Sequence, residues 1–247
     1  MDRLIYTALT GMTARGRQQT VTANNLANAA TTGFRRELVA AEGRYFAGNV
    51  ITSRVQSGAP SLATPQDPGR VSPTGRGLDI AMGGNAWLAV QGPVVKGEPT
   101  EAYTRRGDLQ VSATGVLQNG DGRAVIGQNG APVTVPAGAE LSIAGDGGLS
   151  ARVGEVTTRI GRLKLVDGSG LGNLDKAGDG LFAPPEPLAF DAAARVTSGA
   201  LEAANVQTAG ALAELVAESR GFEVNARLLG VAKDIDERTA RLMAFDS

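Results

Sequence analysis

The last part of the chain, from about Thr208 to Phe245, carries the apolar spacing of one long α-helix. No proline interrupts it, and at about 1.5 Å per residue it would extend roughly 55 Å. Steps of three and four from Leu212 give Leu215, Ser219, Phe222, Ala226 and Leu229, and a second stripe of the same period runs Val224, Leu228, Val231, Ile235 and Leu242. A helix that is apolar on more than one side needs partners that bury its apolar stripes. These partners lie either elsewhere in the chain or in another molecule.

The beginning of the chain carries a leaner pattern of the same kind. Its seam positions alternate four and three residues apart: Ile5, Leu9, Met12, Gly16, Gln19, Ala23 and Leu26. Glycine, glutamine and several threonines lower the intrinsic helix preference, so this helix should be mostly unfolded by itself. The two ends therefore predict either an ordinary intramolecular helical hairpin or two helices that gain order by packing against neighbouring copies.

The composition excludes several classes of function. The formal net charge is -1, with 24 basic and 25 acidic residues, so no strong field exists to attract nucleic acid or an anionic membrane. Cysteine and histidine are both absent, which removes disulfides, cysteine zinc sites and every Ser-His or Cys-His arrangement. Asp-Gly turns lack the ligand spacing of a calcium loop. We therefore expect no enzyme, no metal and no cofactor.

Membrane and export signals are also missing from the sequence. No run approaches the ~18 apolar residues that span a bilayer. The first residues do not show the apolar core of a cleavable secretory signal. We expect no direct membrane insertion, and either a cytoplasmic location or export by a route that reads no such signal.

The middle of the chain changes to a period of two. Short apolar runs such as Trp87 to Val90 are separated by glycine-rich turns at intervals of ~8–12 residues, which is typical of an antiparallel all-β domain. Trp87 and Phe182 are its expected large core residues. A short helix is expected from Glu37 to Phe46, and the prolines after it indicate an extended connector.

The predicted fold class is α+β, with long N- and C-terminal helices paired as a coiled coil and an inserted antiparallel all-β domain. The terminal helical domain takes its first helix from residues 1–36 and its second from 208–247. An extended connector, 37–76, leads to the β domain at 77–190, and a return connector occupies 191–207.

Four stretches resemble known landmarks of the bacterial flagellar rod and hook family. The segment Asn24-Asn25-Leu26-Ala27-Asn28-Ala29-Ala30-Thr31-Thr32-Gly33-Phe34-Arg35 is similar to its N-terminal signature, and Gly199-Ala200-Leu201-Glu202-Ala203-Ala204-Asn205-Val206 to the entry of its C-terminal helix. Leu78 to Gly84 and Tyr103 to Gly107 resemble its β-domain landmarks. Ser219, Phe222 and Ala86-Trp87-Leu88 depart from the usual residues, which leaves the local packing there open.

The resemblance implies a structural subunit of the rod, the drive shaft that transmits torque across the periplasm and encloses the export channel. Its partners would be other copies of itself, other rod proteins and the flagellar type III export apparatus. The opening residues are similar to the proximal-rod members, the distal-rod members are the alternative, and an unrelated surface adhesin is the competing class. The residues expected to carry subunit packing are Ile5, Leu9, Met12, Asn24, Asn25, Leu26, Asn28, Gly33, Phe34, Asn205, Leu212, Leu215, Phe222 and Leu229.

Overall fold

The computed structural model describes residues 2–40, 43–45, 55–57, 61–95, 97–171, 176–178 and 180–245. The chain divides into two compact units, each built from separate stretches. The first, called the helical unit, comprises Met1–Ala27, Glu37–Ala63 and Gln207–Ser247. The second, called the β unit, comprises Asn28–Arg36 and Thr64–Val206.

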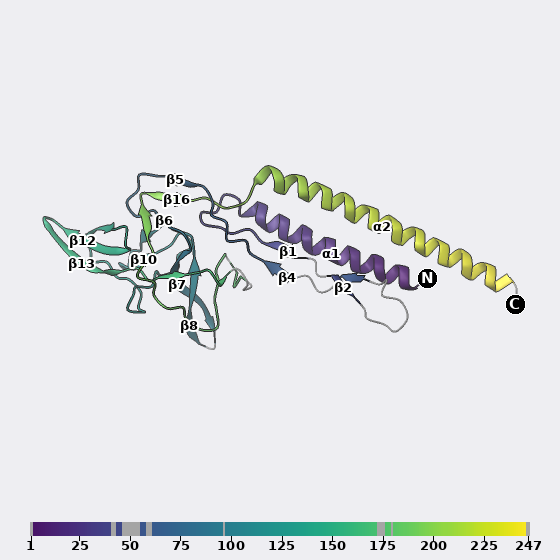
Figure 1. Cartoon of the computed structure of the whole chain (residues 1–247), viewed down its shortest axis with the longest axis horizontal. Coiled ribbons are helices and arrows are strands. Elements are labelled where there is room, and N and C mark those ends of the chain that lie inside the picture. The colour runs from purple at the N-terminus through teal and green to yellow at the C-terminus, as the bar shows by residue number, and fades with distance from the viewer. Residues whose placement is uncertain are drawn as a thin grey trace. The chain divides into compact units, whose positions relative to one another are not determined.

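The helical unit contains helices α1 (Asp2–Ala27) and α2 (Thr208–Phe245), which run antiparallel and side by side (Figure 1). Small and polar residues line the contact. Thr22 Oγ1 donates a hydrogen bond to Glu218 Oε1 over 2.9 Å. A Cβ added at Gly221 would come within 2.3 Å of Arg15 Nη1, so a larger residue there would require the Arg15 side chain to move.

The expected coiled coil is not present, and this part of the predicted fold class was wrong. A coiled coil buries its large apolar seam residues in holes on the partner helix. Here Leu9, Leu212 and Phe222 are exposed. The side of α2 that is least exposed carries mainly small or polar residues, with two leucines among them: Ala211, Leu215, Glu218, Gly221, Asn225, Leu229 and Ala232. The helices approach through side chains too small to form the predicted seam.

Short strands complete the helical unit. Strand β1 (Leu38–Ala40) pairs antiparallel with β4 (Ser61–Ala63), and β2 (Gly43–Tyr45) pairs with β3 (Val55–Ser57). The short helix expected from Glu37 is therefore wrong over 38–40 and 43–45, while Phe46 lies outside the described residues. Pairing with a segment about twenty residues later overrides the local helix preference.

The β unit is an antiparallel β structure, as predicted. Strand β7 (Ala86–Val95) lies between β8 (Glu98–Thr104) and β14 (Leu165–Asp167), while β12 (Gly148–Val153) lies between β11 (Glu140–Ile143) and β13 (Val156–Arg162). The remaining strands form two-stranded ladders: β5 (Val71–Pro73) with β16 (Ala200–Glu202), β6 (Ile80–Met82) with β15 (Val196–Ser198), and β9 (Gln110–Val111) with β10 (Leu117–Gln118).

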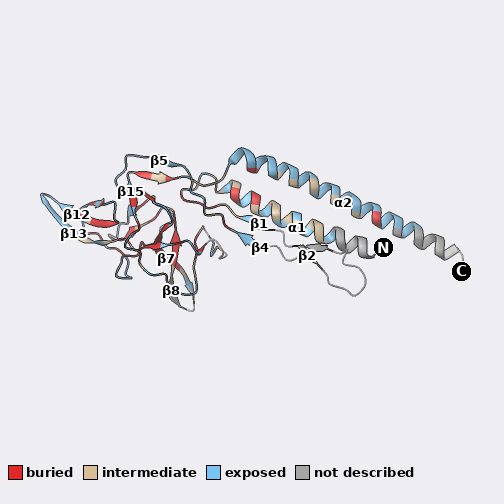
Figure 2. Ribbon diagram, viewed as in Figure 1, coloured by how far each residue is buried: buried red, intermediate tan, exposed pale blue. Residues whose placement is uncertain are grey.

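Trp87 and Phe182 are central to the packing of the β unit. Both are almost fully buried, and their rings meet edge to face with centroids 5.1 Å apart. Leu88 and Val90, on the same strand as Trp87, enter a larger core cluster with Ile80, Leu117 and other aliphatic residues. The prediction that Trp87 and Phe182 are core residues is confirmed. Figure 2 shows the contrast between this buried interior and the largely exposed surface of α2.

Candidate subunit-packing surfaces

The segment Asn28–Arg36 folds as part of the β unit rather than as a continuation of α1. It is a tight turn, in which Asn28 O accepts a hydrogen bond from Thr31 N over 3.0 Å. Gly33 is in the left-handed region at φ 67°, and its N–H donates to Glu202 O over 2.7 Å. A Cβ at this position would lie 2.1 Å from Arg105 O, so the backbone contact requires glycine.

A buried ionic cluster follows directly after this turn. Glu202 Oε1 lies 2.7 Å from Arg35 Nη1, and Glu202 Oε2 lies 2.7 Å from Arg105 Nη2. All three side chains are at most 3% exposed. Arg105 also donates to the carbonyl oxygens of Met82, Gly84 and Ala86, and Gly69 N donates to Glu202 Oε1.

The charges of this cluster do not cancel, since one carboxylate serves two guanidinium groups. Burial lowers the pKa of Arg35, the attraction of Glu202 opposes that effect, and repulsion from Arg105 adds to it. Buried charges are costly unless they are paired and hydrogen-bonded. Glu202 is therefore the residue on which both buried arginines depend.

Phe34 is an apolar anchor beside the cluster. Its ring is buried, and Lys176 Nζ lies 4.0 Å from the ring centroid in a cation–π contact. The same Lys176 Nζ donates to Arg35 O over 2.5 Å. The aromatic residue of the signature segment thus packs within the β unit of its own chain.

Two asparagines fasten backbone segments inside their own units. In the helical unit, Asn25 Nδ2 donates to Glu37 O and Asn25 Oδ1 accepts from Glu37 N, over 2.8 and 2.9 Å. In the β unit, Asn205 Oδ1 accepts from Arg36 N over 2.6 Å. Asn205 Nδ2 donates to the carbonyl oxygens of Pro65 and Asp67. Both side chains form hydrogen bonds with backbone groups that strands or helices leave unpaired.

The other predicted packing residues are distributed over both units. Asn28, half-buried, accepts a hydrogen bond from Thr31 Oγ1 within the β unit. In the helical unit, Asn24 is exposed. Half-buried there are Met12, Leu26, Leu215 and Leu229, whereas Leu9, Leu212 and Phe222 are exposed. Ile5 belongs to α1, but its side chain lies outside the described residues.

A row of apolar side chains on α2 faces solvent in this chain. We call it the outer stripe: Leu212, Val216, Val224, Leu228, Val231 and Ile235. Each of its members is between 45% and 56% exposed. Val224, Leu228, Val231 and Ile235 follow each other at steps of four, three and four, so these four share one side of the helix, whereas Leu212 and Val216 lie nearer its start. Exposed apolar side chains grouped in this way are characteristic of an interaction surface.

A groove of about 510 Å³ lies in the same unit, beside α1. Its lining is mostly apolar or small: Thr13, Gly16, Arg17, Thr20, Val21, Val39 and Leu62. A Cβ added at Gly16 would meet nothing within 4 Å. The groove is therefore open at Gly16, the smallest residue of the predicted seam.

Sequence reasoning missed the buried ionic cluster. Arg35, Arg105 and Glu202 all lie in the stretches that resemble family landmarks, yet none was assigned a packing role. The available signal was a charged residue among small or apolar ones, as in Ala200-Leu201-Glu202-Ala203. Sequence alone could not have paired them, because Arg105 and Glu202 are 97 positions apart.

Within the part of the chain that the structure describes, no group of three or more acidic residues is arranged to hold a metal ion. Among the same residues, neither helix combines the length and hydropathy that a membrane crossing requires.

Comparisons with known proteins give a consistent result. Three family profiles match: "Flagella basal body rod protein" over residues 5–35, "Flagellar hook protein FlgE/F/G D1 domain" over 81–151, and "Flagellar basal body rod FlgEFG protein C-terminal" over 197–242. The chain is 37% identical over 257 residues to the flagellar basal-body rod protein FlgF of Escherichia coli K12, covering 99% of this chain and 100% of the relative. The FlgF protein of Salmonella typhimurium gives the same identity and coverage. FlgG of Bacillus subtilis is 29% identical over 267 residues, covering 98% of this chain and 99% of that protein.

Proposed function

This chain belongs to the flagellar basal-body rod protein family, and on that premise we propose that it builds the rod by packing its terminal helices against neighbouring rod subunits. It is a structural subunit of the flagellar basal body. The 37% identity to two F-type proteins, against 29% to a G-type protein, supports the F type. The competing reading as a surface adhesin finds no support in these relatives.

The outer stripe of α2 is the observation that carries this proposal. Burying a large aliphatic side chain completely gains about 1.5–3 kcal/mol. Six side chains that are about half exposed could therefore gain roughly 5 kcal/mol on contact, before the costs of association. A gain of this size is too small to hold two copies together at low concentration. It becomes sufficient when several neighbours in a polymer add similar contacts.

The groove beside α1 supports the same packing. A neighbouring helix could lie over Thr13, Gly16 and Thr20, because their small side chains allow close approach. Leu9 and Leu212, which are exposed in the single chain, would then become buried in the assembly. Contacts between unlike surfaces of identical subunits do not close on themselves, and they generate a helical filament.

The proposal extends to the position of the subunit within the rod. We place the subunit in the proximal rod, where the shaft crosses the periplasm, transmits torque and encloses the export channel. Its partners would be copies of itself, other rod proteins and, during export, the flagellar type III apparatus. An unfolded chain passing a narrow channel would regain its helices when neighbours bury the outer stripe. The role is structural and requires no catalysis.

The test compares two aspartate substitutions on α2 in cells that lack the wild-type gene. Leu228→Asp introduces a charge into the outer stripe, whereas Ala226→Asp places the same side chain at an exposed position outside it. We expect Leu228→Asp to abolish swimming and rod formation and Ala226→Asp to leave both intact. Both substitutions carry a similar local cost for the helix, so equal swimming in the two strains would overturn packing through the stripe.

A further inference from the structure

The hairpin of β12 and β13 ends in an apolar tip. Val153 and Val156 are direct neighbours across the ladder and are 53% and 67% exposed. Between them, Gly154 takes a φ of 62° and Glu155 is exposed. We call these four residues the hairpin tip. Its combination of two aliphatic side chains and one carboxylate is a small amphipathic surface without a partner among the described residues of the chain.

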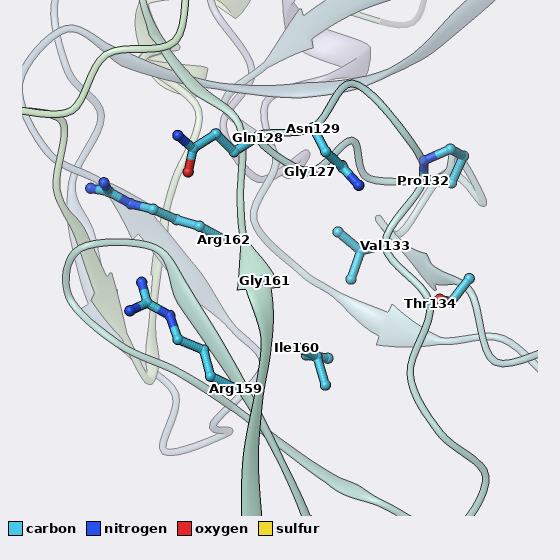
Figure 3. Close-up of a pocket in the computed structure, with 10 residues that line it drawn as sticks. All are labelled: Gly127, Gln128, Asn129, Pro132, Val133, Thr134, Arg159, Ile160, Gly161 and Arg162. Atoms are coloured by element: carbon cyan, nitrogen blue, oxygen red, sulfur yellow. The ribbon is translucent and has the colours of Figure 1, made fainter.

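A cleft of about 460 Å³ opens at the other end of β13. Figure 3 shows Arg159 and Arg162 on one side of this strand, and Ile160 on the other side, which it shares with Val133 and Thr134. The remaining lining residues are Gly127, Gln128, Asn129, Pro132 and Gly161. The cleft therefore offers an apolar side and a basic side next to each other.

The basic side is only partly neutralised. Asp146 Oδ2 lies 4.0 Å from both Arg159 Nη2 and Arg162 Nε, so one carboxylate is shared between two guanidinium groups. Arg162 is further held by a hydrogen bond from its Nε to Asp146 O and by the ring of Phe190 at 4.9 Å. Arg159 is the more exposed of the two, at 67%. It is the guanidinium that an incoming carboxylate can reach.

The tip cannot occupy the cleft of its own chain. Val156 and Ile160 belong to the same extended strand, where four steps of ~3.3 Å hold them roughly 13 Å apart. The hairpin would have to fold back on its own strand to close that separation. An occupant with the tip's chemistry has to come from another copy.

We propose that the hairpin tip of one copy docks into the cleft of the next, with Val153 and Val156 against Ile160 and Val133, and Glu155 beside Arg159. The proposal rests on the proposed function, which brings copies into contact, and it adds an outer contact between β units. The matching charge and the matching apolar groups select a second copy over a partner of other chemistry. The contact joins unlike surfaces, so it can repeat along a polymer without closing.

The natural chain has no cysteine, which makes disulfide trapping specific. Thr157→Cys marks an exposed position next to the tip and keeps Glu155, and Thr134→Cys marks an exposed position of the cleft. The two single variants are expressed together in cells without the wild-type gene, and the cells are oxidised briefly. We expect a mixed dimer at least fivefold more abundant than in cells that combine Thr157→Cys with Gln110→Cys, an exposed position elsewhere on the β unit.

Swimming of the same cells reports separately on rod assembly. Swimming cells without the mixed dimer would overturn the tip–cleft contact and leave the rod function standing. Charge reversal provides a second test that needs no cysteine. Glu155→Arg and Arg159→Glu should each reduce swimming, and one chain that carries both should restore it. Normal swimming of both single variants, or a double variant as defective as the singles, would also overturn the contact.

Discussion

Arg105 and Glu202 face each other over 2.7 Å inside the β unit, although 97 positions separate them in the chain. Arg35 approaches the same carboxylate from the signature segment near the N-terminal helix. Three stretches that were identified separately as family landmarks therefore meet in one ionic cluster. Within this chain, the three landmarks contribute to one buried structure.

Glu202→Gln should strongly destabilise the β unit. The amide keeps the shape of the side chain but leaves two buried guanidinium groups without a counter-charge, and removing one partner of a buried ion pair costs about 3–5 kcal/mol. Urea unfolding followed by fluorescence measures this directly, because Trp87, the only tryptophan, lies in the β-unit core. The exposed Glu186→Gln serves as control, with an expected change below about 0.5 kcal/mol.

Gly33→Ala should lower the free energy of unfolding more than an ordinary glycine-to-alanine change at positive φ does. Gly122 provides the comparison, because it has a φ of 76° and its added Cβ would meet nothing within 4 Å. Gly122→Ala should therefore cost only the backbone term, about 1–2 kcal/mol. Gly33→Ala adds a collision with Arg105 O at 2.1 Å. Equal losses in the two variants, measured by urea unfolding, would show that the turn can move away from Arg105.

Tyr103 should make the β unit less stable in alkali. Burial raises the pKa of its phenol, and the hydrogen bond from its hydroxyl to Glu101 Oε1 at 2.7 Å raises it further. Since the folded-state pKa lies above the unfolded value of about 10, the associated stability is complete below pH ~10 and is lost as the pH rises above it.

Tyr103→Phe isolates this effect. The variant loses two hydrogen bonds at neutral pH, one to Glu101 Oε1 and one from Leu188 N, which should cost about 1 kcal/mol each. Its free energy of unfolding should then fall less steeply above pH ~10 than that of the natural chain, by up to about 1.4 kcal/mol per pH unit. If the free energies of unfolding of the two proteins, measured in urea, fell equally with rising pH, a raised phenol pKa would be contradicted. All other titratable groups are present in both proteins.

Asn25→Ala should loosen the start of β1. The substitution removes both hydrogen bonds between the Asn25 amide and the Glu37 backbone, which are worth about 1 kcal/mol each. Hydrogen exchange at the Glu37 amide should become roughly tenfold faster or more. An exchange rate at Glu37 equal to that of the natural chain would argue that the Asn25 amide does not fasten this segment.

The β unit was the more predictable part of the fold, because its signals are local. Short apolar runs and glycine-rich turns identify a strand such as β7 without reference to distant residues. The same reasoning failed at Leu38–Ala40. That strand forms by pairing with Ser61–Ala63, and no local pattern of the 37–46 stretch contains its partner.

The coiled coil was a different kind of error. The stripes of α2 were read correctly as apolar, but periodicity does not say which stripe another element covers. Leu215 and Leu229 are half-buried on the side nearest α1, whereas Val224 and Leu228 remain in the open. The predicted packing residues in these helices therefore stay predictions until an assembled rod is examined.

The division of the chain into its two units has a mechanical consequence. The backbone passes between them four times, after Ala27, Arg36, Ala63 and Val206. The passage after Arg36 is tied on both sides, by Asn205 at Arg36 and by Asn25 at Glu37, and Asn205 also binds Asp67, just after the passage at Ala63. Four covalent segments of backbone therefore connect the two units, and a twisting load on one unit passes to the other through all four. This connectivity suits a component of a rotating shaft.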